Sequence, residues 1–133
     1  MAIPGEELLE RLRAGYEAFN RGDYNAATAW VHPDVVFISL SPGRTELRGA
    51  DALRAWMEPD AFESQVSEPE VIEIAGSRVL IRQMTRARGA GSGIELETGS
   101  WAVWSFDEEG RVIRMENFSE QEEELARRAL RAP

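Results

Sequence analysis

The sequence predicts an α+β fold in a single domain, and two observations lead to this expectation. The stretch from Ile94 to Phe118 is typical of a long β-hairpin, because two runs rich in β-branched and aromatic residues flank the acidic break at 107–110, which ends in a glycine. The predicted elements also follow the order helix, helix, strand, helix and then successive antiparallel strands. A chain of 133 residues can bury one core, so we expect one domain over residues 1–133.

Two helices are expected at the start of the chain. Apolar residues at helical spacing from Leu9 to Phe19 predict an amphipathic helix that ends at Asn20-Arg21-Gly22. Asp23 can cap a second, shorter helix that runs as far as Val31. Pro33 then stops this helix, because proline disfavours helical geometry in the residue before it.

A strand, a third helix and a loop come next. The run from Val35 to Leu40 has strand composition, and Ser41-Pro42-Gly43 after it is typical of a turn. A short helix is expected from Ala50 to Met57, with its apolar residues on one side. The polar stretch from Glu58 to Pro69 is interpreted as an irregular loop in which Phe62 turns inward.

Strands dominate the second half of the chain. They are expected at Val71 to Ile74 and at Val79 to Arg88, and the glycine-rich connector Gly89 to Gly93 then leads into the hairpin. Ser119 and Glu122 match a capping box and predict that a last helix opens there. Its inward side would carry Leu125, Ala126, Ala129 and Leu130.

The composition excludes several classes of function. All 15 basic residues are arginine, cysteine is absent and His32 is the only histidine. We therefore expect no Schiff-base lysine, no thiolate nucleophile and no metal site of cysteine or clustered histidine. The net charge of −9 argues against nucleic acid or an anionic membrane as partner. No apolar run approaches a membrane span or a signal segment, so the expected location is the cytoplasm.

Four stretches follow one another along the chain: Tyr16 to Asp23, His32 to Phe37, Arg48-Gly49 and Phe106 to Ile113. In this order they resemble the SnoaL-like (polyketide cyclase-like) group of the nuclear transport factor 2-like superfamily, which includes ketosteroid isomerase. The resemblance covers nearly the whole chain. It implies a cystatin-like cone, in which a strongly curved antiparallel sheet wraps around the N-terminal helices and leaves a deep, mostly apolar pocket. Members commonly form dimers through the outer face of the sheet.

The catalytic residues of ketosteroid isomerase are not retained under this resemblance. That enzyme uses a general-base aspartate together with an oxyanion hole of a tyrosine and a protonated aspartate. The base falls on Ser39, the protonated aspartate on Ala102 and the tyrosine on Gly15. Tyr16 does not simply substitute, since one residue along a helix rotates a side chain by about 100°. The sites of scytalone dehydratase and limonene epoxide hydrolase, rich in acids or histidine, are not matched either. No catalytic residue is therefore assigned, and no cofactor is expected.

The same register predicts which strand residues face the pocket. They are Val79, Ile81, Gln83, Thr85, Ala87, Ser100, Ala102, Trp104, Phe106, Met115 and Asn117. The predicted substrate-binding set combines some of these with residues from the helices and the first strand: Tyr16, Trp30, Ser39, Trp56, Gln83, Thr85, Trp104 and Asn117. It contains hydroxyls, amides and a phenol but no carboxylate. Glu73, Glu97 and Glu116 are the carboxylates whose appearance in the pocket would change this interpretation.

Two side chains allow more than one interpretation. His32 has a suitable pKa range for a base, yet beside a proline it can also bond backbone groups or Asp34. Tyr16 fits core packing on the inner stripe of the first helix, and it would also serve as a hydrogen-bond donor in a pocket.

The outer face of the sheet is predicted to form a homodimer interface. Arginines, glutamates and apolar residues alternate there, including two aromatics, and Arg82 or Arg86 is expected to pair with Glu116 across strands. The expected interface residues are Arg82, Met84, Arg86, Trp101 and Glu116. The alternative is a solvated face with isolated apolar residues.

Two functions follow from this reading. The first is binding of a small apolar or aromatic molecule, with cofactor-free isomerase, cyclase or lyase chemistry on a carbonyl compound, in which Tyr16, Gln83 and Asn117 polarise the substrate. The alternative is a non-catalytic module that binds a ligand or dimerises, with the pocket aromatics acting only as core.

Overall fold

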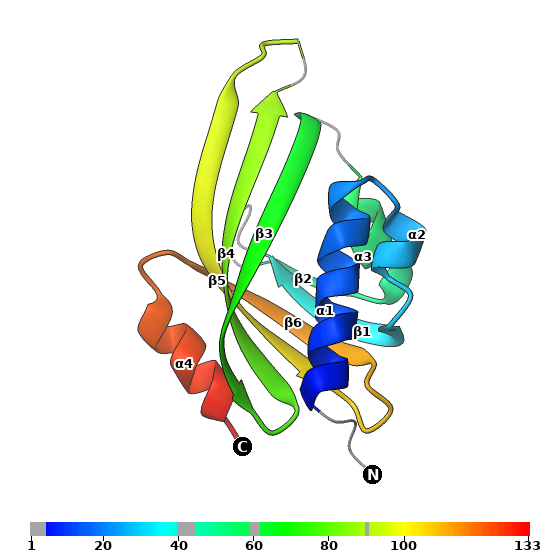
Figure 1. Ribbon diagram of the computed structural model, residues 1–133, viewed down its shortest axis with the longest axis vertical. Coiled ribbons are helices and arrows are strands. Elements are labelled where there is room, and N and C mark those ends of the chain that lie inside the picture. Colours follow the sequence, from blue (N-terminus) through cyan, green and yellow to red (C-terminus); the bar gives the residue numbers. More distant parts are fainter. Residues whose placement is uncertain (1–4, 40–44, 59–61, 90) are drawn as a thin grey trace.

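The computed structural model describes residues 5–39, 45–58, 62–89 and 91–133, apart from the side chains at 62–64. It shows an α+β fold in which a six-stranded, curved and unclosed sheet carries helices on both faces (Figure 1). The predicted fold class is confirmed. The expected turn at Ser41-Pro42-Gly43 and the inward position of Phe62 lie outside the described residues and side chains.

Three helices lie on the concave face of the sheet and one on the convex face (Figure 1). The concave side carries α1 (Gly5–Asn20), α2 (Tyr24–Ala27) and α3 (Ala50–Met57). The convex side carries α4 (Glu123–Arg131). Helix α1 buries Leu8, Leu12 and Tyr16 along one stripe, as its apolar spacing predicts.

Helix α2 is shorter than predicted. It is capped by Asp23, whose Oδ1 accepts from the Ala26 N–H at 3.1 Å, as expected. It ends at Ala27, however, and Val31 begins the first strand by pairing with Val112. The prediction that the helix runs to Val31 was wrong, because this segment pairs with the sheet: the Val112 N–H donates to the Trp30 carbonyl at 2.7 Å.

The six strands are ordered β2-β1-β6-β5-β4-β3 across the sheet. Their bounds are β1 (Val31–Ser39), β2 (Thr45–Arg48), β3 (Phe62–Ala75), β4 (Arg78–Gly89), β5 (Glu95–Phe106) and β6 (Val112–Ser119). All neighbouring strands are antiparallel except β1 and β6, which run parallel. The expected purely antiparallel sheet is thus a mixed one.

Strand β2 was not predicted from the sequence, and β3 was predicted only in part. Strand β2 has only four residues, one of them apolar, and so lacks a recognisable pattern. The stretch from Glu58 to Pro69 was expected to be a loop, but β3 starts at Phe62 and pairs with β4 along its length. Because β3 is an edge strand, Pro69 can sit in it without removing a ladder bond.

The curvature of the sheet follows from bulges. The pairing of β3 with β4 shifts register between Val71 and Glu73, and the pairing of β5 with β6 shifts between Ser105 and Phe106. An extra residue in one strand bends it and increases its twist. The main core fills the concave side, where α1 and α3 pack on inward residues of the strands such as Val79 and Ile81.

Helix α4 covers part of the convex face, which was predicted from the sequence to form a homodimer interface. Ala126 and Leu130 pack against Leu80, Trp101, Val103 and Phe118. Trp101 is only 8% exposed, and its Nε1–H donates to the Glu120 carbonyl at 3.2 Å. The two aromatics predicted on this face, Trp101 and Phe118, are therefore both buried within the chain.

The charged pairs on the convex face also differ from expectation. Arg82 pairs with Glu120 at 2.6 Å, and Arg86 pairs with Glu97 at 3.1 Å and with Glu68 at 3.4 Å. Glu116 lies 3.4 Å from Arg114 on its own strand. The predicted pairing of Arg82 or Arg86 with Glu116 is thus not formed, because Glu116 lies opposite Val103 on the far side of β5 from these arginines.

The predicted capping box before α4 is half formed. The Ser119 N–H donates to Glu122 Oε1 at 2.8 Å, as the motif requires. The helix begins only at Glu123, however, so Glu122 and not Ser119 is the N-cap residue. The chain turns between Ser119 and Glu122 to bring α4 back over the sheet.

The turn between β5 and β6 generates the first prediction. Asp107 Oδ1 accepts the backbone N–H groups of Glu109 and Arg111, both at 2.9 Å, and Oδ2 accepts Arg111 Nε–H at 3.0 Å. Burial acts to raise the pKa of Asp107, but these donors outweigh it and hold the pKa below its usual value. Asp107→Ala should lower the free energy of unfolding by about 1–2 kcal/mol at neutral pH.

Because the folded-state pKa is depressed, this contribution is present above the ordinary carboxyl pKa of about 4 and is lost as pH falls through the folded value. Urea unfolding at pH 7 and near pH 3 measures it. Glu108→Ala, an exposed residue of the same turn, is the matched control. An equal loss at both pH values would show that the carboxylate charge does not act as described.

Candidate functional site

A cavity of about 120 Å³ lies between the concave face of the sheet and helices α1 to α3. Its wall is mainly apolar. The described residues that line it are Arg11, Gly15, Tyr16, Phe19, Ala26, Ala27, Trp30, Val31, Phe37, Trp56, Met57, Gln65, Ser67, Gln83, Thr85, Trp104, Phe106, Val112, Met115 and Asn117. An apolar cavity of roughly 150 Å³ in another protein holds a benzene ring. The size of this cavity therefore suits about one ring.

Most of the predicted site residues meet at this cavity. Those in its wall are Tyr16, Trp30, Trp56, Gln83, Thr85, Trp104 and Asn117. Ser39 is the exception, because it is buried at the end of β1 opposite Thr45 of β2 and is not among the described residues of the wall. Their role in binding remains a prediction.

The cavity also contains residues that sequence reasoning missed. Gln65 and Ser67 were assigned to a loop, although their period-two spacing is that of a strand. Arg11 lies on α1 among charged residues, and nothing in its local sequence distinguishes it. Gly15 was considered only as the place where ketosteroid isomerase has its tyrosine.

A directional chain of hydrogen bonds crosses the polar part of the wall. The Tyr16 hydroxyl donates to Gln83 Oε1 at 2.6 Å. Gln83 Nε2 donates to Asn117 Oδ1 at 3.1 Å and to Ser100 Oγ at 3.0 Å. Asn117 Nδ2 in turn donates to the Ile38 carbonyl at 3.1 Å. The chain links α1, β4, β6 and β1.

Tyr16 is both a core residue and part of this polar chain, so the two interpretations of it combine. Its ring stacks on Trp104 with centroids 5.3 Å apart and planes 15° from parallel. Burial raises the pKa of Tyr16 well above its usual range, because the phenolate would lose its hydration. The side chain is therefore a neutral phenol at physiological pH and does not act as a base.

Ser67 and Thr85 form a second polar spot, fixed by α1. Their hydroxyl oxygens lie 3.3 Å apart. The Asn20 side chain clamps the Ser67 backbone, since its Nδ2 donates to the Ser67 carbonyl at 2.9 Å and its Oδ1 accepts the Ser67 N–H at 2.7 Å. The end of α1 is thereby attached to β3.

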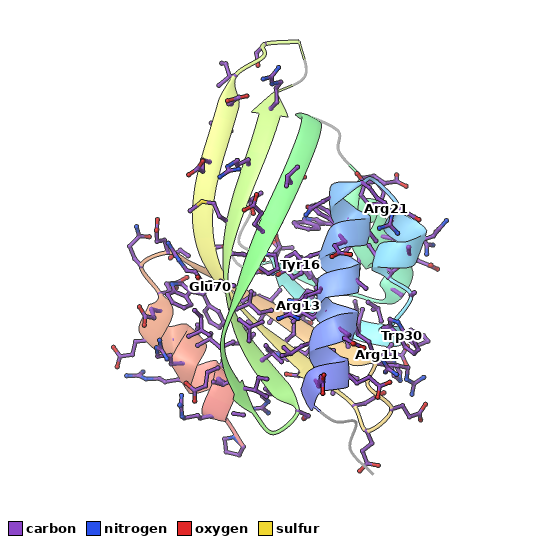
Figure 2. All side chains as sticks on the ribbon, viewed as in Figure 1. Arg11, Arg13, Tyr16, Arg21, Trp30 and Glu70 are labelled. Carbon is purple, nitrogen blue, oxygen red and sulfur yellow. The ribbon has the colours of Figure 1, made fainter. Side chains whose placement is uncertain are left out.

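Two tryptophans mark where the cavity reaches solvent. Trp30 and Trp56 both line it, yet they are 46% and 45% exposed. The Arg11 guanidinium lies 3.7 Å from the centroid of the Trp30 ring and donates to the Glu109 carbonyl at 2.8 Å. Figure 2 shows Arg11 and Trp30 together beside α1, while Tyr16 points from that helix toward the sheet.

Among the described residues of the wall there is no aspartate, glutamate or histidine. The three carboxylates singled out in the sequence lie elsewhere. Glu73 pairs with Arg127 and Arg131 of α4, while Glu97 pairs with Arg86. Glu116 pairs with Arg114.

His32 takes a structural position. Its Nδ1 accepts the Asp34 backbone N–H at 3.0 Å, in the segment that carries Pro33, and it lies outside the described wall of the cavity. In the part of the chain that the structure describes, no group of three or more His, Cys, Asp or Glu residues could hold a metal ion. No described helix is long and apolar enough to cross a membrane.

The chain shares its fold, a curved sheet against N-terminal helices, with two solved structures that are described as NTF2-like proteins and are 24% and 13% identical to it. The chain belongs to the SnoaL-like domain family, whose model matches residues 12–115. No functionally curated protein sequence matches the chain significantly.

Solved structures with the same fold include two crystallised with small molecules. TerC, co-crystallised with polyporic acid, has a TM-score of 0.70 and 20% identity, and the match covers 92% of this chain and 96% of TerC. A Mycobacterium tuberculosis protein in complex with estradiol-17beta-hemisuccinate has a TM-score of 0.70 and 16% identity, with 83% and 91% covered.

A third similar structure is SalBIII, described as an epoxide hydrolase/cyclase-like enzyme in pyran ring formation. It has a TM-score of 0.74 and 15% identity, with 85% of this chain and 90% of SalBIII covered. At these identities the likeness shows the fold and does not assign an activity.

The buried phenol generates the second prediction. The chain has two tyrosines and neither lysine nor cysteine, so in Tyr24→Phe any phenolate signal at alkaline pH comes from Tyr16. The phenolate of Tyr16 should form only as the protein unfolds. Absorbance of the phenolate and circular dichroism, followed together through an alkaline titration, measure this.

The raised pKa of Tyr16 decides in which direction stability changes with pH. Stability from the protonated phenol is complete below the ordinary value of about 10 and is lost as pH rises above it. Tyr16→Phe should abolish this part of the alkaline transition. A phenolate signal near pH 10 in protein that is still folded would show that Tyr16 is accessible to water.

Proposed function

We propose that this protein binds a small, mainly apolar molecule containing a ring, noncovalently, in the cavity under α1. The observation that carries the proposal is the wall itself: aromatic and aliphatic side chains surround one connected set of polar groups, Tyr16, Gln83 and Asn117. Sites for small molecules commonly combine an apolar lining with a few fixed polar groups. The cavity size favours a compact ligand, and larger ones would extend past Trp30 and Trp56.

The similar structures support this proposal in a general way. TerC and the M. tuberculosis protein were each crystallised with a small organic molecule. Their fold, which this chain shares, therefore accommodates such ligands.

The proposed binding function has two alternative forms, an enzyme and a non-catalytic module. As an enzyme, the protein would carry out cofactor-free isomerase, cyclase or lyase chemistry, and SalBIII shows that the fold accommodates cyclase-like activity. The wall offers no described carboxylate or imidazole for general acid–base work, so rate enhancement would come from holding the substrate in a reactive conformation. As a non-catalytic module, it would bind its ligand through the same contacts.

The third prediction tests binding with two matched glycine variants. Gly15 lies in the wall, and a Cβ there would sit 3.7 Å from the Ala27 carbonyl oxygen and 3.9 Å from Trp104 Cη2, which are ordinary contacts. Gly15→Ala should therefore stabilise α1 by about 0.5–1 kcal/mol and at the same time weaken ligand binding, because its methyl group occupies part of the cavity. Gly5→Ala, on the same helix with open space around it, should leave binding unchanged.

The measurement is tryptophan fluorescence on titration with toluene and phenol, with thermal unfolding in parallel. The proposal is supported if a probe binds saturably to the wild type and to Gly5→Ala but binds more weakly to the more stable Gly15→Ala. If the wild type shows no saturable response to either ring, or if both variants respond alike, the cavity is not the binding site.

We further propose that the protein is a cytoplasmic homodimer. The interface would be the part of the convex face that α4 leaves open, with Met84 and Arg86 of β4 and Glu116 of β6. Arg82 and Trp101, expected there from the sequence, would contribute only at its edge, because Glu120 and α4 contact them within the chain. Fractionation of cells that make the protein tests its location.

The fourth prediction concerns this interface. Met84→Glu should convert a dimer into a monomer, because a buried, unpaired charge at the contact opposes association. Sedimentation equilibrium measures the mass, and ligand binding by the variant shows that it is folded. A wild type that is monomeric at high concentration, or a variant that remains a dimer, contradicts the proposed interface.

A further inference from the structure

The direction of the hydrogen-bond chain is set by one backbone atom. The Ile38 carbonyl oxygen can only accept, so the Asn117 carboxamide must present its NH₂ group to it. Asn117 Oδ1 then faces Gln83, which must donate through Nε2. That leaves Gln83 Oε1 facing Tyr16, whose hydroxyl must donate to it. A reversal anywhere along the chain would place two acceptors or two donors face to face.

This fixed direction decides what Tyr16, Gln83 and Asn117 can offer a ligand. Both N–H groups of Gln83 are used, one by Asn117 and one by Ser100, and the Tyr16 proton is directed to Gln83. Unused lone pairs remain on Tyr16 Oη, Gln83 Oε1 and Asn117 Oδ1, whereas Asn117 keeps a single further N–H. The polar spot is therefore mainly an acceptor.

We propose that the ligand of this cavity presents a hydrogen-bond donor, as a phenol or an enol does, and that the site prefers it to the corresponding carbonyl compound. This inference rests on the proposed binding function and narrows its ligand class. A hydroxyl group adds its bond to Tyr16 Oη or Gln83 Oε1 without disturbing the chain. A carbonyl oxygen bound to Tyr16 would first have to displace Gln83 from a 2.6 Å bond and leave the half-buried Gln83 amide oxygen without this donor.

The inference replaces one part of the interpretation from sequence. Tyr16, Gln83 and Asn117 were expected to polarise a substrate that is a carbonyl compound. In the structure, the hydrogen-bonding groups of these side chains that remain unused are mainly acceptors, because Ile38 and Asn117 fix the orientation of both amides.

The test compares phenol, benzaldehyde and toluene, which share one ring and differ in the polar group. Calorimetric titration of the wild type and of Gln83→Leu gives the ratio of phenol to benzaldehyde affinity for each protein. Comparing the two ratios cancels the different hydration of the probes. Gln83→Leu removes the acceptor of the Tyr16 proton and frees that proton for a carbonyl, so the ratio should fall by about five-fold or more, the effect of one neutral hydrogen bond.

Gln121→Leu is the matched control, since it makes the same change at an exposed glutamine just before α4. Its ratio should equal that of the wild type. A ratio that is unchanged in Gln83→Leu, or that falls equally in Gln121→Leu, overturns the inference.

A measurement on the wild type alone covers the case in which Gln83→Leu does not fold. The infrared carbonyl stretch of bound benzaldehyde should match its value in an apolar solvent, because Tyr16 does not donate to it. A shift to the lower frequency found in hydrogen-bonding solvents overturns the inference. If toluene and phenol bind equally well, this inference fails and the binding function stands; if none of the three probes saturates, the binding function fails as well.

Discussion

The carbonyl of Ile38 and the amide of Asn117 fix the arrangement on which the concave side of this protein depends. Through Gln83 and Tyr16 the bond between them ties β1, β6, β4 and α1 into one chain. Polar groups in an apolar wall are unfavourable unless each is bonded, and no described buried side-chain nitrogen or oxygen is left without a partner. A displacement of α1 along the sheet would break this chain, so the network holds the helix over the cavity.

The two faces of the sheet cover their tryptophans in different ways. Both carry tryptophan. On the concave face Trp104 stacks on Tyr16 and borders a space that the helices do not fill. On the convex face Trp101 lies under α4, whose Ala126 and Leu130 pack closely enough to leave it buried. The bulges that bend the sheet make this asymmetry possible, because a curved sheet encloses volume on one side only.

The sequence predicted local structure well wherever the pattern itself was strong. The bounds of α3 and the hairpin of β5 and β6 follow from apolar periodicity and from the glycine that ends the turn. The first half of β3 could not be predicted in this way, since its polar residues form a strand only because β4 offers them a ladder. The amphipathic pattern of α4 correctly places Ala126 and Leu130 on the buried side, but Leu125, which was also expected to face inward, is 44% exposed. The pattern also does not identify the surface that buries the helix.

The site shows the same division between local pattern and tertiary contact. Period-two alternation placed Gln83, Trp104 and Asn117 on one face, and the structure brings them to one cavity. Alternation cannot say in which direction their amides point, however, because that depends on Ile38, a backbone group 79 residues away from Asn117 in the chain. The consequence is chemical as well as structural. With a phenol kept neutral by burial and both amides held in one orientation by the sheet, these side chains support the proposal of a ligand that bears a hydroxyl group.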